Sequence, residues 1–135
     1  MDKALQDTVA AIAFETRMWV QAKADQANYH PDDLLGWCAI AASELSRRLN
    51  TAGIPTTIYV KNEYPCHCYC MVDDYVVDVT ATQFREYKDV EVLILHSKEA
   101  EVNEYHCGTM QFGTGAELRV YQQKTRWPSC QLAFA

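Results

Sequence analysis

Two β-prone runs separated by the pair Asp73-Asp74 constrain the fold of this chain more than any other feature. Residues 66–72 alternate between small and larger side chains. Residues 75–80 read Tyr-Val-Val-Asp-Val-Thr and are rich in β-branched side chains. A connection of two turn-forming residues predicts a tight antiparallel hairpin, in which the residues on either side of the turn pair with each other.

The hairpin fixes which side chains share a face of the sheet. Because successive side chains of a strand point to opposite faces, His67 and Asp78 lie on one face as diagonal cross-strand neighbours. A histidine and an aspartate on an inward face are costly unless they bond to each other. The pattern therefore predicts a His67–Asp78 pair, which could serve catalysis or only hold the sheet together.

The opposite face of the same strand carries three cysteines, Cys66, Cys68 and Cys70. Neighbours along one strand face cannot easily form disulfides with each other, so we interpret them as free thiols. Free cysteine packs as a small apolar residue, and these three are predicted to lie beneath a helix. A zinc or thiol-handling site on this strand is the alternative, although metal sites more often take their ligands in pairs from turns.

Two helices are predicted before the strands. Apolar residues recur at helical spacing over residues 4–23 and 37–50, and Gly53 follows the second segment as a stop signal. The remaining predicted elements are strands over residues 56–61 and 91–96 and, over residues 117–122, either a strand or a short helix. Helices followed by strands predict an α+β fold, with N-terminal helices packed on an antiparallel sheet.

Composition narrows the class of protein. The 135 residues fit a single domain over 1–135, and the net charge of −6 argues against nucleic acid and against anionic membranes as partners. No apolar run approaches the ~20 residues that span a bilayer, and the N-terminal residues do not resemble a secretory signal. We therefore expect a cytoplasmic protein whose six cysteines are reduced.

Cys38 stands at the predicted start of the second helix. Unpaired backbone N–H groups and the positive end of the helix dipole favour a thiolate at such a position. A thiolate nucleophile, a histidine that accepts its proton and a carboxylate that orients the histidine form one functional set. Cys38, His67 and Asp78 supply these three residue types, although Cys38 alone would equally fit a small buried residue.

These residues resemble the core of the transglutaminase-like family, within the papain-like cysteine protease superfamily. Residues 36–55 begin Gly-Trp-Cys, end Gly-Ile-Pro and resemble the Gly-x-Cys helix of that family. His67-Cys-Tyr resembles its His-x-aromatic strand, and Asp78-Val-Thr resembles its Asp-x-Thr segment. The matches fall within residues 36–84, about a third of the chain, and their order is more specific than any one of them.

The resemblance implies a role for each residue. Cys38 would be the nucleophile, His67 the general base and then acid, and Asp78 the carboxylate that orients His67. Backbone N–H groups at the helix start, including that of Cys38, would bind the oxyanion. The glutamine that papain-like enzymes carry shortly before the cysteine has no counterpart here. A second oxyanion donor is therefore unassigned. Gln83, which follows the Asp78 strand directly, could donate a hydrogen bond into the cleft or cap the end of the strand, and Trp37 is a candidate pocket wall.

The expected function is a thiol-dependent hydrolase or acyltransferase that acts on amide bonds, as a peptidase, amidase, deamidase or transamidase. Its substrate would be a peptide, a protein or a small amide, and neither a cofactor nor a metal is expected. Hydrolysis ranks first because no sequence feature marks a site for an amine acceptor. The alternatives are a catalytically inactive binding domain of the same fold and, ranked lower, a zinc or thiol-handling protein that uses Cys66, Cys68 and Cys70.

Overall fold

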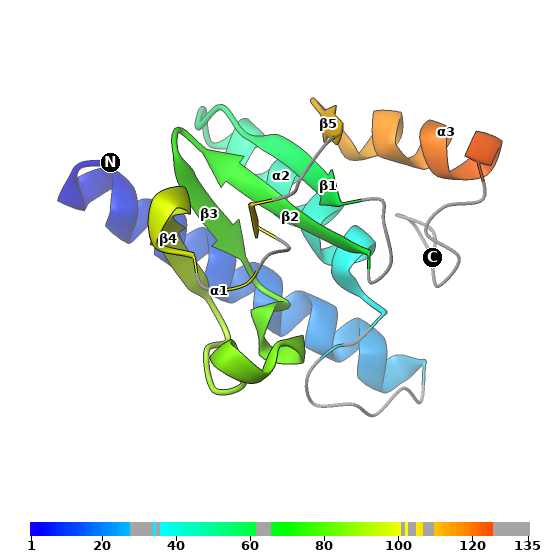
Figure 1. The fold of residues 1–135 in the computed structure, drawn as a ribbon, viewed down its shortest axis with the longest axis horizontal. Helices are drawn as coiled ribbons and strands as arrows, with labels where there is room; N and C mark the ends of the chain where they lie inside the picture. The colour runs from blue at the N-terminus through cyan, green and yellow to red at the C-terminus, as the bar shows by residue number, and fades with distance from the viewer. Residues whose placement is uncertain are drawn as a thin grey trace.

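The computed structural model describes most of the chain, including all three residues of the predicted Cys–His–Asp set. The described residues are 1–27, 34, 36–61, 66–100, 102, 105–106 and 110–125. Two helices lie against one face of an antiparallel sheet in Figure 1, and the third helix lies beyond one sheet edge.

The two predicted N-terminal helices are present. Helix α1 (Lys3–Gln26) is capped by Asp2, whose side chain accepts a hydrogen bond of 2.8 Å from the backbone N–H of Leu5. Helix α2 (Cys38–Thr51) begins at the candidate nucleophile and buries most of its residues. A third helix, α3 (Gly115–Thr125), includes residues 117–122, for which either a strand or a short helix was predicted. The structure shows that this segment is helical.

Five antiparallel strands form the sheet of the described chain. They are β1 (Thr57–Lys61), β2 (His67–Val72), β3 (Tyr75–Asp78), β4 (Leu93–His96) and β5 (Met110–Phe112), in the order β4-β3-β2-β1-β5. Helices packed on an antiparallel sheet confirm the predicted α+β class. Strand β5 was not predicted, because three residues carry too short a pattern and the strand forms by pairing with β1.

The predicted hairpin register is confirmed. Val72 pairs with Tyr75, and Asp73 takes the positive φ of 51° that the tight turn requires. Strand β3 ends at Asp78, two residues before the predicted end at Thr80. The cause is local, because the Asp78 side chain accepts hydrogen bonds of 2.8 Å from the backbone N–H and 3.1 Å from the hydroxyl of Thr80, which turns the chain out of the strand.

The sheet separates two apolar clusters. The larger lies between the sheet and helices α1 and α2, and it includes Cys38, Cys68 and Cys70. The smaller lies on the opposite face, and includes Tyr69 of β2 and Tyr105. The 3-10 helices η1 (Ala81–Gln83), η2 (Arg85–Tyr87) and η3 (Ser97–Glu99) connect the strands that flank this second cluster.

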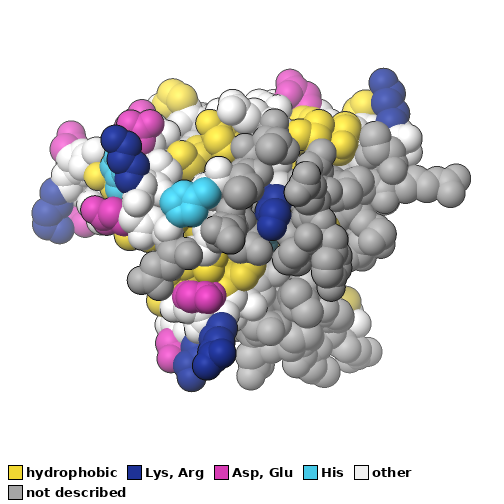
Figure 2. Space-filling model, in the orientation of Figure 1, with side chains coloured by type: hydrophobic (Ala, Val, Ile, Leu, Met, Phe, Trp, Pro, Cys, Tyr) yellow, Lys and Arg dark blue, Asp and Glu magenta, His cyan; other side chains and the backbone are white. Residues whose placement is uncertain are grey.

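Acidic and basic side chains lie beside one another at the left and lower margins of the face in Figure 2. The described surface there is of mixed sign, in keeping with a chain that has 12 basic and 18 acidic residues. None of the helices in the described ranges combines the length with the apolar run that crossing a membrane requires.

Candidate active site

A strained turn leads the chain into the helix of the candidate nucleophile. The N–H of Trp37 donates a 3.0 Å hydrogen bond to the carbonyl of Leu34, and this bond closes a four-residue turn. Gly36 has a φ of 90°, in the left-handed region that glycine adopts without strain. Leu34 also has a positive φ of 57°, a conformation that a branched side chain adopts only at a cost. The turn places Cys38 in the first turn of α2.

Helix α2 and strand β2 start at the same end of the molecule. The Cys70 thiol donates to the carbonyl of Ala42 across 3.3 Å. Cys38 precedes Ala42 by one helical turn and hydrogen-bonds to Cys68, which precedes Cys70 by two residues on β2. Helix and strand therefore run in the same direction. Because His67 is the first residue of β2, its side chain reaches the start of α2 and also hydrogen-bonds to Cys38.

His67 and Asp78 form the predicted cross-strand pair. Nε2 of the His67 ring lies 2.7 Å from Oδ2 of Asp78, and both side chains are buried, with 1% and 2% of their surface exposed. Because Asp78 occupies Nε2, we assign the other ring nitrogen, Nδ1, to the interaction of His67 with Cys38; Nδ1 also lies 3.0 Å from Nε2 of Gln83. The imidazole thus connects the thiol to the carboxylate.

The environment favours a charged imidazole. Burial by itself lowers the pKa of His67, but the charge and the hydrogen bond of Asp78, together with those of Cys38, outweigh burial and raise the pKa to about 10. The pKa of the Asp78 carboxyl moves below its usual range, because His67, Tyr105 and Thr80 offset the effect of burial. Both pKa shifts favour the imidazolium and the carboxylate over the neutral pair at neutral pH.

Two equally buried thiols of this protein shift in opposite directions. A hydrogen bond from the Cys68 side chain, opposed by burial and reinforced by His67, holds the pKa of Cys38 well below that of an ordinary thiol. Burial, reinforced by the negative charge of Asp78, raises the pKa of Cys70 far above that range. Only the thiol next to the imidazolium is set up to ionise.

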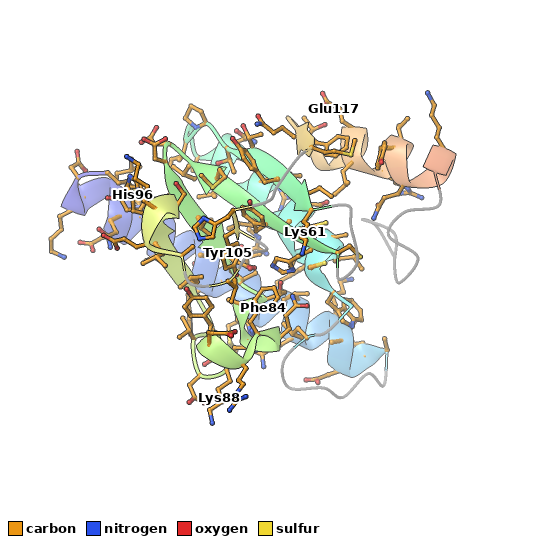
Figure 3. The ribbon with its side chains drawn as sticks, viewed as in Figure 1. Lys61, Phe84, Lys88, His96, Tyr105 and Glu117 are labelled. Carbon is orange, nitrogen blue, oxygen red and sulfur yellow. The ribbon has the colours of Figure 1, made fainter. Side chains whose placement is uncertain are left out.

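Three aromatic rings surround the imidazole of His67. The ring centroid of His67 lies 4.7 Å from that of Phe84, 5.8 Å from that of Tyr105 and 6.0 Å from that of Tyr69. Phe84 and Tyr105 lie close together in Figure 3, and their centroids are 5.8 Å apart. These rings keep water from the His67–Asp78 pair, which strengthens its electrostatic interaction.

The two remaining site candidates lie in different surroundings. Nε2 of Gln83 donates to the Thr80 carbonyl at 3.0 Å, which anchors η1, and it lies 3.0 Å from Nδ1 of His67. An amide nitrogen only donates, so it hydrogen-bonds to Nδ1 when the imidazole is neutral and Nδ1 accepts. Trp37 is only 4% exposed, and its side chain belongs to the core. Its backbone N–H donates to the backbone carbonyl of Leu34, so this N–H is already used in the turn before α2.

Three residues near the site were not among the predicted triad, oxyanion or pocket candidates. Tyr105 donates its hydroxyl proton to Asp78. Cys68, predicted to pack beneath a helix or, as the alternative, to serve a zinc or thiol-handling site, hydrogen-bonds to Cys38. Arg17 of α1 is buried and donates to the Val79 carbonyl at 2.9 Å and to the Thr82 hydroxyl at 2.8 Å, which fixes the chain just after Asp78. Arg17 did carry a signal, since it is a charged residue within the apolar stripe of α1.

The alternation of β2 turns Cys68 and Cys70 toward α2 rather than toward a shared centre. Across the described residues, no three histidine, cysteine or acidic side chains converge in a way that could hold a metal ion. Comparisons with protein-family models, with curated proteins and with solved structures gave no match. Any assignment of chemistry to this site therefore rests on the residues and geometry of this chain.

Proposed function

We propose that this chain is a transglutaminase-like thiol hydrolase or acyltransferase that acts on amide bonds through Cys38, His67 and Asp78. One observation carries the proposal. A single buried imidazole bonds through Nε2 to Asp78 and hydrogen-bonds to a thiol at the start of a helix. That arrangement supplies a nucleophile, a proton carrier and an orienting carboxylate in contact with one another.

The reaction would begin from the thiolate–imidazolium pair. The Cys38 sulfur attacks the carbonyl carbon of the amide, and the electron pair of the carbonyl bond moves to oxygen. When the tetrahedral intermediate collapses, the C–N bond breaks and His67 donates its Nδ1 proton to the departing amine. His67, now neutral, takes a proton from water or from an acceptor amine, which attacks the Cys38 thioester. Collapse of the second intermediate releases the product, and the thiolate–imidazolium pair is restored.

Gln83 is the best candidate for a side-chain donor to the oxyanion, beside the backbone N–H of Cys38. Its amide nitrogen donates one N–H to the Thr80 carbonyl and directs the other toward Nδ1 of His67, at 3.0 Å, the ring nitrogen that we assign to the Cys38 side. Once Nδ1 carries a proton it no longer accepts from Gln83, and this second N–H becomes available to the oxyanion. A donor in that position stabilises the charge that develops on the carbonyl oxygen.

Gln83→Leu therefore separates acyl transfer from simple thiol reactivity. Acylation of Cys38 by p-nitrophenyl acetate should slow by about 10²- to 10³-fold, the usual effect of losing one oxyanion donor. Alkylation by iodoacetamide, which forms no oxyanion, should change little. Gln111→Leu, the same substitution on β5, serves as the control. Equal losses in both reactions would instead indicate that Gln83 only positions His67.

Burial is the observation that favours the competing proposal, a catalytically inactive binding domain. Cys38 is only 3% exposed, and His67 and Asp78 are buried as well. A structural His–Asp pair in a core would have the same burial. The enzyme proposal adds a requirement that the binding domain lacks, namely a thiolate that depends on His67. It also requires a reducing compartment such as the cytoplasm, which keeps Cys38 free.

The pH dependence of Cys38 alkylation, measured by mass spectrometry, decides between these proposals. In the wild type, labelling by iodoacetamide should reach its plateau well below the ordinary thiol pKa of ~8.5, because His67 stabilises the thiolate. His67→Ala should return the profile to that of an ordinary thiol. Thiolate absorbance in the ultraviolet, taken as the difference from Cys38→Ala, reports ionisation independently of reagent access. A wild-type profile that follows an ordinary thiol and ignores His67 would refute the catalytic proposal.

A further inference from the structure

Tyr105 contacts the carboxylate of the candidate triad directly. Its hydroxyl donates to Oδ2 of Asp78 across 2.5 Å, the short distance of a charge-assisted O–H···O⁻ bond. The Tyr105 side chain is 4% exposed, and burial together with the charge of Asp78 raises its pKa far above the usual range, so that it stays a donor. Tyr105 follows Asp78 by 27 residues and belongs to neither strand of the hairpin.

The backbone of Tyr105 is itself fixed. Its N–H donates to the carbonyl of Val102 at 3.2 Å, and its carbonyl accepts from the hydroxyl of Tyr69 at 3.4 Å. The ring packs edge-on against that of Tyr69, with centroids 4.9 Å apart. A phenol held in this way places its hydroxyl with little freedom, as a group that orients a neighbour requires.

The hydroxyl completes the set of donors around Asp78. Oδ2 accepts from His67 and from Tyr105, while Oδ1 accepts from the N–H and the hydroxyl of Thr80. Donors to both oxygens stabilise the ionised form of a buried carboxylate and hold its plane in one orientation.

We propose that Tyr105 is a positioning residue for the triad, whose hydroxyl keeps Asp78 ionised and aimed at His67 and thereby sets the lower pH limit of the Cys38 thiolate. This inference rests on the proposed function. Without the hydroxyl, the buried carboxylate loses a donor and takes up a proton at higher pH. A neutral Asp78 no longer supports the imidazolium, so the thiolate is lost at higher pH as well.

The titratable and charged groups that face this cluster come from five parts of the fold. They are Cys38 of α2, His67, Cys68, Tyr69 and Cys70 of β2, Tyr87 of η2, Arg17 of α1 and Tyr105 itself. Of these, His67 and Tyr105 hydrogen-bond to the carboxylate oxygens of Asp78. The acid limb of the Cys38 alkylation profile is the part at low pH where the rate falls because the thiolate takes up a proton. The pKa of the Cys70 thiol lies too high for Cys70 to titrate on this limb.

Tyr105→Phe keeps the ring and its packing and removes only the hydroxyl. In the alkylation profile of Cys38, we expect the acid limb to move up by about one pH unit, the effect of one hydrogen bond to a charged group, with the plateau unchanged. On that limb the rate should fall about tenfold. Tyr59→Phe makes the same change on β1, where the ring packs against Tyr69, and should leave the profile in place. A purely structural role would lower the melting temperature without moving the limb.

The outcomes distinguish this inference from the proposed function. If wild-type Cys38 titrates as an ordinary thiol, both the proposed function and the role of Tyr105 are refuted. If the wild type has the low acid limb and Tyr105→Phe keeps it unchanged, only the role of Tyr105 is refuted. Should Tyr105→Phe not fold, proton NMR of the wild type replaces it. A slowly exchanging hydroxyl proton with Overhauser contacts to the Tyr105 ring and to the Nε2 proton of His67 is expected, and its absence would refute the bond.

Discussion

Alanine at position 38 will abolish acyl transfer while leaving the fold intact. The substitution removes the only atom proposed to attack the carbonyl, so no thioester can form. After brief exposure to p-nitrophenyl acetate, the acetyl adduct found at position 38 of the wild type should be absent, as judged by peptide mass mapping, while the slow acetylation of exposed lysines should match that of the wild type. The packing cost is small, because the substitution removes a single buried sulfur atom, and we expect the stability to change by less than about 1 kcal/mol. Removing a buried thiolate can even raise the melting temperature, as often happens at functional sites.

Cys70→Ala is the matched control for this prediction. Cys70 is as buried as Cys38, lies against the same helix and donates to the carbonyl of Ala42, yet its pKa is raised rather than lowered. Its loss should therefore cost stability through packing and leave acylation at Cys38 unchanged. Acylation that survives in Cys38→Ala but disappears in Cys70→Ala would place the reactive thiol elsewhere.

The parts of the site that the sequence predicted depend on short-range rules. The Asp73-Asp74 turn fixes the register of the hairpin, and the register fixes the parity that brings His67 and Asp78 together. The position of Cys38 at a helix start follows from the helical spacing of apolar residues over residues 37–50. Because turn chemistry and strand alternation act over a few residues, one sequence suffices to apply them.

The missed features depend on contacts between distant segments. Tyr105 reaches Asp78 from a part of the chain with no periodic pattern, and nothing in its neighbouring residues indicates a bond to that carboxylate. Strand β5 exists only through its pairing with β1. Cys68 was assigned correctly to the face opposite His67, but its contact with Cys38 depends on how α2 lies over β2, which alternation alone does not specify.

The burial of the three residues determines what the site needs from its surroundings. A thiolate, an imidazolium and a carboxylate in a core are each costly without partners. Here Cys38 contacts His67 and His67 contacts Asp78, so each charged form has a partner. Thr80 and Tyr105 donate the remaining hydrogen bonds to the carboxylate oxygens of Asp78. The positive φ of Leu34, just before α2, is a further cost at the same place. Such costs collect where a fold maintains a functional arrangement at the expense of stability.

Asparagine at position 78 will leave the chain folded and reduce acyl transfer by about 10⁴-fold, the loss that the wrong histidine tautomer causes in a serine triad. The side-chain oxygen of asparagine can still accept from the N–H of Thr80, which keeps the turn after β3. Its amide nitrogen would donate to Nε2 of His67, so the ring would carry its proton on Nδ1 and could not take the proton of Cys38. His67 would also lose the charge that raises its pKa to about 10, and would become neutral rather than an unpaired buried cation.

Asp73→Asn provides the matched control, since it makes the same chemical change in the turn of the same hairpin. Asparagine tolerates the positive φ of 51° at that position, so both the fold and the acylation rate should be preserved. The measurements are the acylation rate of Cys38, the pH profile of its alkylation and the thermal unfolding of each variant. A folded Asp78→Asn protein with a normal acid limb would remove Asp78 from the mechanism. An Asp78→Asn protein that fails to fold, beside a stable Asp73→Asn protein, would show that the His67–Asp78 pair is structural.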